Sequence, residues 1–489
     1  MASLVFYLGA SVLFAQSTLA FNCSKPPVYV DIHKRAVHDS PVFQYGSFIG
    51  VGSPPQNHSL WPSLSLNHTS FAARSYCSNS TLRDCETSTG GFFQPRDSTS
   101  FSEQKDFQTL DSSSNLTKGF FGKDIIRLYT HYFETDGASQ TLLENSTVKV
   151  SESGSAIGSM VGMGDSSTVL RDLASRDMIA GRTYSLYIGQ GFDRAGGAVN
   201  GSNTFGGYDS GRFTGPVSKY SMDSSKMNPM SLLVKDIVLT ESANPKSNVS
   251  LFDPSAFPSM KSRPEKFLAE ITTDQYPLSL PYQITQNFIS RLGAVKDNTW
   301  NDNSLKLKNP FNGTLSIILD DDFTVTLPAE ILSNQSNITP IQDRDEKSTA
   351  PFYLSVAFLT QVYLMADYDS QNFFLARAVQ KNNAVMPVPF CPKSTPVAYE
   401  PPKQNAWLKQ GLIGAVIGGV LGGIGVAFAA YCFVLSCRRR VREKKMEKEM
   451  ERGRREVKMA QMEVEDVPEF DPPPKSKKMA AKGIFGWRK

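Results

Sequence analysis

A run of 27 residues without a charged side chain, residues 411–437, constrains this chain more than any other feature of its sequence. As a helix, the run would span about 40 Å at about 1.5 Å per residue, which is enough to cross a bilayer with some tilt. Ten Lys and Arg residues fall within 438–457 but only three within 391–410, so the positive-inside rule places the C-terminus in the cytoplasm. A core helix of a soluble protein is the alternative. We expect a single-pass type I membrane protein whose large N-terminal part lies outside.

The N-terminus carries a second targeting signal. Residues 1–20 contain an apolar stretch from Leu4 to Phe14 and end in Thr18-Leu19-Ala20, whose small residues suit a signal peptidase. We therefore predict a cleaved signal peptide, entry into the secretory pathway, and a location at the plasma membrane or cell surface.

The formal net charge of +4 is concentrated in the tail. Residues 438–489 contain 17 Lys+Arg against 10 Asp+Glu, or +7, which leaves about −3 for the residues upstream. Because no basic stripe with interleaved aromatic residues covers the main part of the chain, we exclude a nucleic-acid-binding body.

The predicted outer part is rich in Asn-x-Ser/Thr sequons, the acceptor sites of N-glycosylation. Use of some of them on exposed turns predicts a glycoprotein made by a eukaryotic secretory route. The sequons begin at Asn22, Asn57, Asn67, Asn79, Asn115, Asn145, Asn200, Asn248, Asn312, Asn334 and Asn337.

Six cysteines divide into four outer and two inner residues. Cys77 and Cys85 lie eight residues apart in a polar stretch, which predicts a local disulfide in an oxidising compartment. Cys23 and Cys391 remain as the second outer pair, at the two ends of the ectodomain. The inner pair, at 432 and 437, suits either S-acylation or plain apolar packing at the membrane edge.

The segment between the signal and the apolar run has a β-rich pattern. Short apolar runs are separated by Gly, Asn, Asp and Pro clusters, and helices are expected mainly at 170–179 and 282–292. Because 489 residues exceed what one compact core usually holds, we expect at least two lobes. The runs that predict strands most clearly are 28–30, 314–319, 323–327, 361–365 and 373–376.

Several motifs, in order along the chain, resemble pepsin-like aspartic peptidases, in particular the membrane-anchored pepsin-like proteins of filamentous fungi. YGSFIGVGSPPQ (45–56) is similar to that family's first hairpin, and the most specific matches are TFGGYDSGRFTG (204–215) and AFLTQVYLMADYDSQNFFLARA (357–378). The resemblance covers roughly residues 40–385. It implies an all-β fold, a bilobal pepsin-like double β-barrel ectodomain with a cleft between its lobes, joined here to one transmembrane helix.

The resemblance also implies a division of the chain. In that fold the first and last strands run side by side, which agrees with pairing Cys23 and Cys391. We predict a signal peptide (1–20), an N-terminal lobe (21–217), a C-terminal lobe (218–391), a stalk (392–410), a transmembrane helix (411–437) and a basic cytoplasmic tail (438–489).

The chemistry of this family needs two carboxylates that share one proton, each in an Asp-Thr/Ser-Gly turn. The resemblance places the first acid at Ser63 and the second at Thr272, so both catalytic positions are degenerate. Asp274 is two residues away and lacks the following Gly. The expected flap tyrosine is replaced by Ser112. These departures predict a pseudoprotease with no catalytic residues.

One tripeptide imitates the missing motif. Asp209-Ser210-Gly211 spells the catalytic sequence but lies where the resemblance implies a structural turn. The sequence contains neither a His-Glu-x-x-His motif nor a Cys-x-x-Cys pair, and we predict no metal site and no cofactor.

Three functions remain open on the sequence alone. We favour a cell-surface protein whose cleft binds or senses an extracellular peptide or polysaccharide, because a groove keeps its shape without the acids. The alternatives are an active membrane-anchored aspartic endopeptidase with atypical acids such as Asp274, and a glycosylated spacer. The expected partners are the lipid bilayer and, through a small-residue face at Gly414, Gly418 and Gly422, a second copy of the chain.

Overall fold

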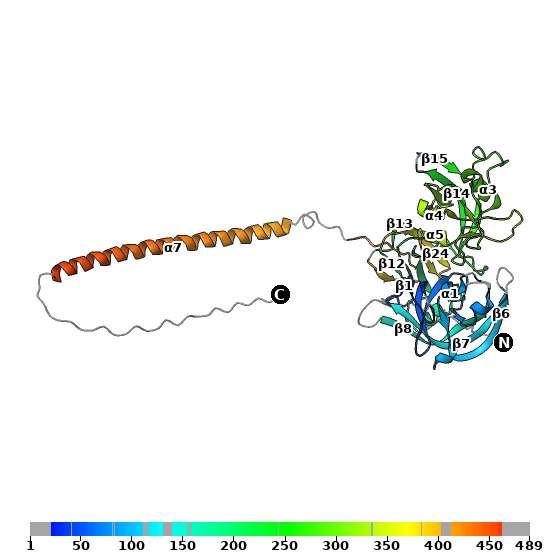
Figure 1. Ribbon diagram of the computed structural model, residues 1–489, viewed down its shortest axis with the longest axis horizontal. Coiled ribbons are helices and arrows are strands. Elements are labelled where there is room, and N and C mark those ends of the chain that lie inside the picture. The colour runs from blue at the N-terminus through cyan, green and yellow to red at the C-terminus, as the bar shows by residue number, and fades with distance from the viewer. Residues whose placement is uncertain are drawn as a thin grey trace, which may run out of the picture. The chain divides into compact units, whose positions relative to one another are not determined.

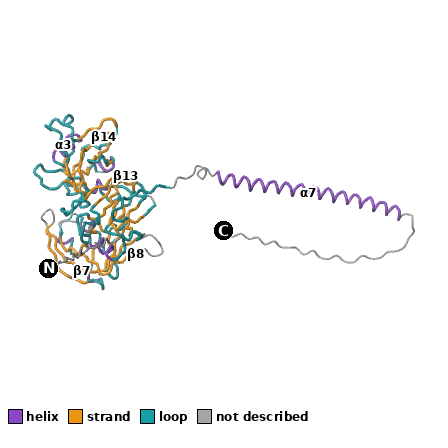
Figure 2. The backbone as a smooth tube through the Cα atoms, turned by 180° about the vertical axis from the view of Figure 1, so that it is seen from behind, coloured by secondary structure: helices purple, strands orange, loops and turns teal. Residues whose placement is uncertain are grey.

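A computed structural model describes residues 21–401 and 412–461, except 41, 81, 83, 111–115, 131–138, 155–157, 243, 334–335 and 383. The predicted signal peptide, the flap position Ser112 and residues 402–410 of the predicted stalk therefore lie outside the described residues. The chain divides into two compact units, Met1–Glu400 and Pro401–Lys489, and each is described by itself. Strands dominate the first unit, and the described part of the second is one long helix (Figure 2).

The largest sheet of the first unit has fourteen strands and contains residues from both halves of that unit. Its six strands from β13 to β1 form the part that the two lobes share, because β23 and β24 come from the end of the unit. In spatial order the sheet consists of β13 (Phe213–Ser221), β24 (Asn372–Ala378), β23 (Val362–Asp367), β10 (Thr183–Tyr187), β11 (Gly201–Phe205), β1 (Val28–Ala36), β2 (Phe43–Val51), β3 (Gln56–Ser63), β9 (Met160–Gly162), β4 (Ser70–Ala73), β8 (Ser139–Ser153), β7 (Leu116–Thr130) and β6 (Ser102–Leu110), with β5 (Phe92–Phe93) paired to β4.

The C-terminal lobe is built on smaller sheets. In Figure 1, β14 and α3 lie at one end of the unit and β6 to β8 at the other, with β13 and β24 between them. The predicted boundary at 217/218 falls inside β13. A six-stranded sheet consists of β20 (Thr324–Leu327), β19 (Gly313–Leu319), β14 (Ser231–Glu241), β16 (Phe267–Ile271) and β22 (Phe352–Leu354), with β15 (Asn244–Ser250) on β14; β17 (Val295–Lys296), β18 (Ser304–Lys306) and β21 (Ile338–Gln342) form a second sheet, and β12 (Gly207–Asp209) pairs with β25 (Pro387–Pro389).

Side-chain alternation explains the strands. Along β19, Leu315, Ile317 and Leu319 are buried while the residues between them are partly exposed, the period of two expected of a strand with one core face. The same alternation in β7 buries Ile126 and Leu128. The resulting apolar core runs through both lobes, and the strands predicted from the sequence are confirmed.

Helices are few, as expected. The helix predicted over 282–292 is α3 (Tyr282–Leu292), which ends at Gly293 in the left-handed conformation with a φ of 63°. The helix predicted over 170–179 starts earlier, because Ser167 accepts the Leu170 amide at 3.3 Å and caps α2 (Thr168–Ser175). The remaining short helices of this unit are α1 (Cys85–Ser88), α4 (Ala329–Leu332), α5 (Val356–Leu359) and two 3₁₀ turns, Cys77–Asn79 and Pro95–Asp97.

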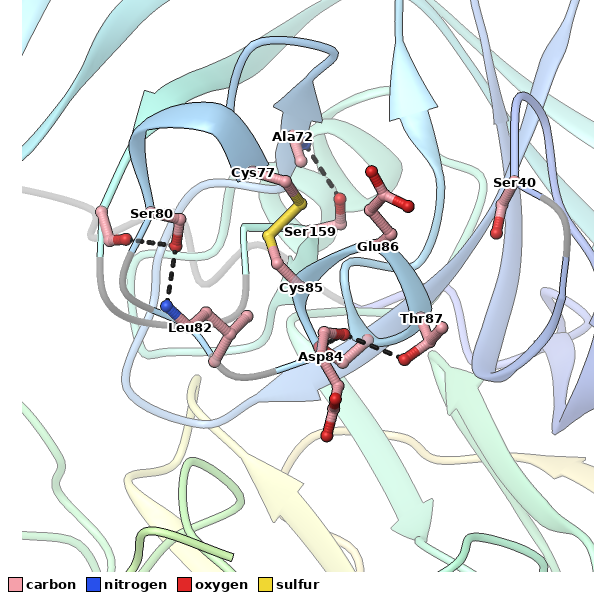
Figure 3. Close-up of a disulfide and its surroundings, with 12 residues drawn as sticks. Ser40, Ala72, Cys77, Ser80, Leu82, Asp84, Cys85, Glu86, Thr87 and Ser159 are labelled. Atoms are coloured by element: carbon pink, nitrogen blue, oxygen red, sulfur yellow. Dashed lines mark hydrogen bonds between the residues drawn. A yellow bond between two sulfur atoms is a disulfide. The ribbon is translucent and has the colours of Figure 1, made fainter.

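Both predicted outer disulfides are present. Cys23–Cys391 joins the segment before β1 to the segment after β25, and it closes a loop of 368 residues. Such a bond restricts the unfolded chain and stabilises the fold by about a few kcal/mol on the chain-entropy account. Cys77–Cys85 closes the local loop before α1 (Figure 3).

The second unit contains α7 (Leu412–Gln461), 50 residues long. By length and composition it is the one described helix that could cross a membrane, with a mean hydropathy of 2.1 in its apolar window. The helix continues without a break from the apolar run into the charged segment. The free cysteines Cys432 and Cys437 are exposed on it.

Candidate functional site

Two strand ends meet where the sequence places the degenerate catalytic positions. Strand β3 ends at Ser63 and pairs with β9, so that Ser63 lies opposite Gly162. Strand β16 ends at Ile271, and the next amide, of Thr272, donates to Leu354 O at 3.0 Å. Each strand end is thus held by a neighbouring strand of its own lobe, and the two together form what we call the seam, residues 61–65 and 272–276.

Asp274 is the carboxylate at the seam. Its Oδ1 accepts the hydroxyl of Ser63 at 2.7 Å, and its Oδ2 accepts the hydroxyl of Ser65 at 2.5 Å. Ser63 is buried, whereas Asp274 is exposed, so solvent reaches the carboxylate from one side. The Asp274 amide donates to the hydroxyl of Thr272 at 3.1 Å, which orients the turn. Asp274 therefore links the C-terminal lobe to two hydroxyls of the N-terminal lobe.

Thr273 forms the other half of the contact. Its hydroxyl accepts the Leu64 amide at 3.1 Å, and its carbonyl accepts Nε1 of Trp61 at 2.7 Å. Thr273 and Leu64 are both buried, with exposed fractions of 2% and 0%. Four of the five residues from 61 to 65 thus bond to two consecutive residues of the other lobe, which makes the seam a tight junction between the two lobes.

Aromatic rings extend the junction to one side. Trp61 contacts Tyr45 and Phe192 at centroid distances of 6.2 and 5.5 Å, and Phe192 contacts Tyr276 at 5.9 Å. The pKa of Tyr276 is raised to about 12, chiefly because burial disfavours the phenolate. Its hydroxyl therefore stays protonated at any physiological pH.

Arg194 completes this aromatic side. Its guanidinium lies 4.4 Å from the ring of Tyr276 and 4.9 Å from that of Trp300, and it donates to Ser304 Oγ at 2.9 Å. It also pairs with Asp302. Because Arg194 follows β10 while the other four residues belong to the C-terminal lobe, this cation joins the lobes a second time.

The seam, residues 61–65 and 272–276, contains one carboxylate, that of Asp274. Within the described residues, the hydrogen bonds of the Asp274 side chain go to Ser63 and Ser65, and none joins it to a second carboxylate or to a histidine. A proton-sharing pair needs one group to activate water and another to protonate the peptide carbonyl. Among the described residues, no second carboxylate is bonded to Asp274 that could act as its acid partner.

The histidines lie elsewhere. His58, on β3, is fully buried at 5.0 Å from the ring of Phe71, and burial lowers its pKa to about 3. His68 contacts Phe121 at 5.0 Å, and burial lowers its pKa as well. Among the described residues, no group of three or more His, Cys, Asp or Glu could hold a metal ion.

Asp209 is a structural residue, as the sequence predicts for the imitating tripeptide. It lies at the end of β12, 1% exposed, and its Oδ1 accepts the amides of Gly211 at 3.1 Å and Met386 at 2.9 Å. Oδ2 lies 3.9 Å from Nε of the buried Arg212. Burial raises the pKa of Asp209, but its bonds tie β12 to the end of the unit and not to the seam.

The structure separates the predicted glycosylation positions by exposure. Asn57, Asn67 and Asn337 are half-buried, and their side-chain oxygens accept hydrogen bonds from Tyr129, Ser166 and Ser333. Exposed positions are Asn22, Asn145, Asn200, Asn248 and Asn312, whereas Asn115, Asn334 and the side chain of Asn79 lie outside the described residues.

A hollow lies away from the seam, beside the Cys77–Cys85 disulfide. It has a volume of about 1020 Å³ and is lined by Asp39, Arg74, Asp84 and Glu86, among others. Figure 3 shows Glu86 and Thr87 next to the disulfide, where the Thr87 hydroxyl donates to Asp84 O at 2.9 Å. Arg74 and Asp39 form an ion pair, so the lining is largely internally paired and polar.

The sequence identified Ser63 and Thr272 but missed the role of Asp274. Ser63 bonds to Asp274 and not to Thr272, whose hydroxyl serves its own turn. One feature of the sequence could have indicated Asp274: it is the one acidic residue in the stretch ITTDQYPLSLP that precedes α3. Two residues of offset put its carboxylate beside the position that the expected acid would occupy.

A comparison with protein families gives one match over more than half of the chain. The family model described as eukaryotic aspartyl protease matches residues 44–378, which is 335 of 489 residues (378 − 44 + 1). Among solved structures, the crystal structure of aspartic proteinase from Irpex lacteus is similar, with a TM-score of 0.49 and 17% sequence identity over 68% of this chain and 94% of that chain. No curated protein matches the chain.

Proposed function

Because this chain belongs to the eukaryotic aspartyl protease family, we propose that it is a catalytically inactive member that binds an extended peptide at its seam. In this proposal the first unit is a glycosylated ectodomain outside the cell, and α7 anchors it as a single-pass protein of the plasma membrane. In this proposal the chain lacks the peptidase activity of its family but still binds a peptide at the corresponding site.

One observation carries the proposal: both carboxylate oxygens of Asp274 accept serine hydroxyls, from Ser63 and Ser65. Two carboxylates placed together lower each other's tendency to ionise and retain one shared proton. The carboxylate of Asp274 has serine hydroxyls as its hydrogen-bond partners and no second carboxylate among them, within the part of the chain that the structure describes. The step that protonates the scissile carbonyl therefore lacks a donor.

Peptide binding draws on different groups. Trp61 and Tyr276 are half-buried at the seam, and Trp300 is 39% exposed beside Arg194. Aromatic surface of this kind contributes binding energy without taking part in catalysis. The residues around Thr273 are already held by hydrogen bonds, so their conformational entropy is not lost again when a peptide binds.

The decisive experiment rebuilds the acid pair in residues 21–400, a unit with its own core and both disulfides. Thr272→Asp with Asp274→Gly rewrites the second turn as Asp-Thr-Gly, and Ser63→Asp with Ser65→Gly supplies the first acid and its glycine. We expect the unchanged protein to leave denatured casein intact at pH 4 and the fourfold variant to cleave it, with inhibition by a pepstatin-type compound.

The matched control carries Asn instead of Asp at position 272, with the other three changes kept. It should be inactive, because one carboxylate remains. Cleavage by the unchanged protein that a pepstatin-type inhibitor stops would overturn the proposal, and loss of that cleavage in Asp274→Asn would establish the alternative of an active endopeptidase.

Binding is tested separately. A mixture of random decapeptides should slow hydrogen exchange of the amides of residues 61–65 and 272–276 in the unchanged protein. Trp61→Ala should weaken this protection, whereas a substitution at the exposed Leu142 on β8 should not. Absence of protection at every peptide concentration would favour the glycosylated spacer.

A further inference from the structure

The charged part of α7, residues 438–458, exposes four large apolar side chains. Val441, Met446, Met450 and Val457 have exposed fractions of 67, 57, 67 and 58%. Three of them fall at intervals of four and seven residues, Met446, Met450 and Val457, with Gly453 three residues after Met450. On a helix with 3.6 residues per turn, these four positions lie along one face.

We propose that this face, the α7 stripe (Met446, Met450, Gly453 and Val457), packs against the same stripe of a second copy of the chain. Alternating steps of four and three residues are the d-to-a and a-to-d steps of a heptad, so Met450 and Val457 occupy a positions and Met446 and Gly453 d positions. The complex is a parallel two-stranded coiled coil, since two copies anchored in one membrane run in the same direction.

The charges that flank the stripe select this occupant. In a parallel pair, a g residue of one helix faces the e residue five positions later on the other. Arg442 then faces Glu447, and Glu449 faces Arg454, so both successive pairs combine opposite charges. Each pair occurs twice by symmetry, which gives four attractive contacts.

An anionic membrane surface fits the stripe less well. A helix that lies on such a surface carries Lys and Arg beside its apolar face. Here the flanking positions carry three acids, Glu447, Glu449 and Glu456, against two bases, Arg442 and Arg454, so anionic lipid would meet more negative than positive charge beside the stripe. The side of the helix that bears the apolar residues is therefore the one least suited to that lipid.

The apolar part of α7 favours the same partner. Met450 lies 36 residues after Gly414, which is ten turns at 3.6 residues per turn, so the two residues point in the same direction from a straight helix. The stripe spans fewer than three heptads, short for a coiled coil free in solution. Anchoring in a bilayer confines the two copies and raises their effective concentration.

Disulfide crosslinking of the full chain in lipid vesicles tests the proposal. With Cys432→Ser and Cys437→Ser in the background, the four remaining cysteines are paired in disulfides, so one added cysteine is the single free thiol. We expect Met450→Cys to form a covalent dimer on mild oxidation at least fivefold faster than Lys448→Cys. Lys448 is the matched control, because it is two residues away and faces the opposite side.

Two further variants check register and packing. Glu449→Arg should reduce crosslinking through Met450→Cys severalfold, and adding Arg454→Glu should restore it, because the pair is then reversed and not lost. Gly453→Leu should strengthen the dimer more than Gly453→Ala, since both raise helix propensity but only Leu fills the d position, where a side chain has open space. Equal crosslinking at 448 and 450, or no recovery in the double charge reversal, would overturn the proposal.

Discussion

Two aspartates of this protein show opposite relations between sequence and role. Asp209 stands in the tripeptide Asp-Ser-Gly but is 1% exposed and bonds to Gly211 and Met386 at the end of β12. Asp274 stands in no catalytic motif, yet its carboxylate lies at the seam on Ser63 and Ser65. The aspartate in the catalytic tripeptide thus has a structural role, whereas the aspartate at the seam lies outside any such tripeptide and bonds two serine hydroxyls. The role of an aspartate in this fold therefore depends on its position in the structure and on the groups that its carboxylate contacts.

The largest expected effect is a loss of stability at acid pH. It concerns the strand beside the seam, because β3 carries both Ser63 and the buried His58. The pKa of His58 is about 3 in the folded protein and near 6.5 in the unfolded chain. Between these values the unfolded chain binds more protons, so stability falls as the pH is lowered from about 6.5 to about 3, by up to about 5 kcal/mol. Urea unfolding of residues 21–400 at pH 7 and pH 4 measures the loss.

The His58→Leu variant is the control, because leucine keeps the volume and does not titrate. It should lose much less stability over the same interval, and an equal loss in both proteins would show that other groups are responsible.

Asp209→Ala should cost about 3 kcal/mol, the largest effect of a single carboxylate. It removes the acceptor of two backbone amides and leaves the buried Arg212 without its nearby anion. Asp209→Asn keeps one acceptor oxygen and should cost less. Unfolding by guanidinium chloride at pH 7 compares the two, and an Ala variant as stable as the unchanged protein would remove the structural role assigned to this turn.

Thr273→Val should cost about 1–3 kcal/mol, because it leaves the buried Leu64 amide without an acceptor. Thr273→Ser retains the hydroxyl and should lose only the methyl group. Thermal unfolding of the three proteins measures the ranking. If the Val and Ser variants unfolded at the same temperature, the Thr273 hydroxyl would not be the group that joins the lobes.

Asp274→Asn should have the smallest effect, within about 1 kcal/mol, because Asp274 is exposed and its side chain keeps one oxygen for Ser63 or Ser65. The same urea series compares it with Asp209→Ala. A loss as large as that of Asp209→Ala would mean that the seam carboxylate is structural too, and the contrast between the two regions would disappear.

Local patterns predicted much of the fold. The alternation of β19, the left-handed Gly293 that ends α3, and the uncharged run in α7 each depend on neighbours within a few residues, so their physics is visible in the sequence. The Cys77–Cys85 bond spans eight residues and was equally accessible. The early start of α2 at the Ser167 cap was missed because apolar periodicity does not register a capping hydroxyl.

The contacts at the seam could not be predicted from local patterns. Ser63 and Asp274 are 211 residues apart, and no local pattern shows that their side chains meet. Arg194 was missed for the same reason, since its stacking on Tyr276 and Trp300 brings a loop after β10 against the other lobe.

The sequence alone determined that neither expected catalytic position carries an acid, because residue identity is independent of folding. It also determined the apolar run and the difference in composition between the residues before this run and the basic segment after it. Only the tertiary structure decided which carboxylate occupies the seam and what it bonds to. That outcome depends on the packing of β3 against the turn after β16, where two hydroxyls and one carboxylate from distant parts of the chain satisfy one another.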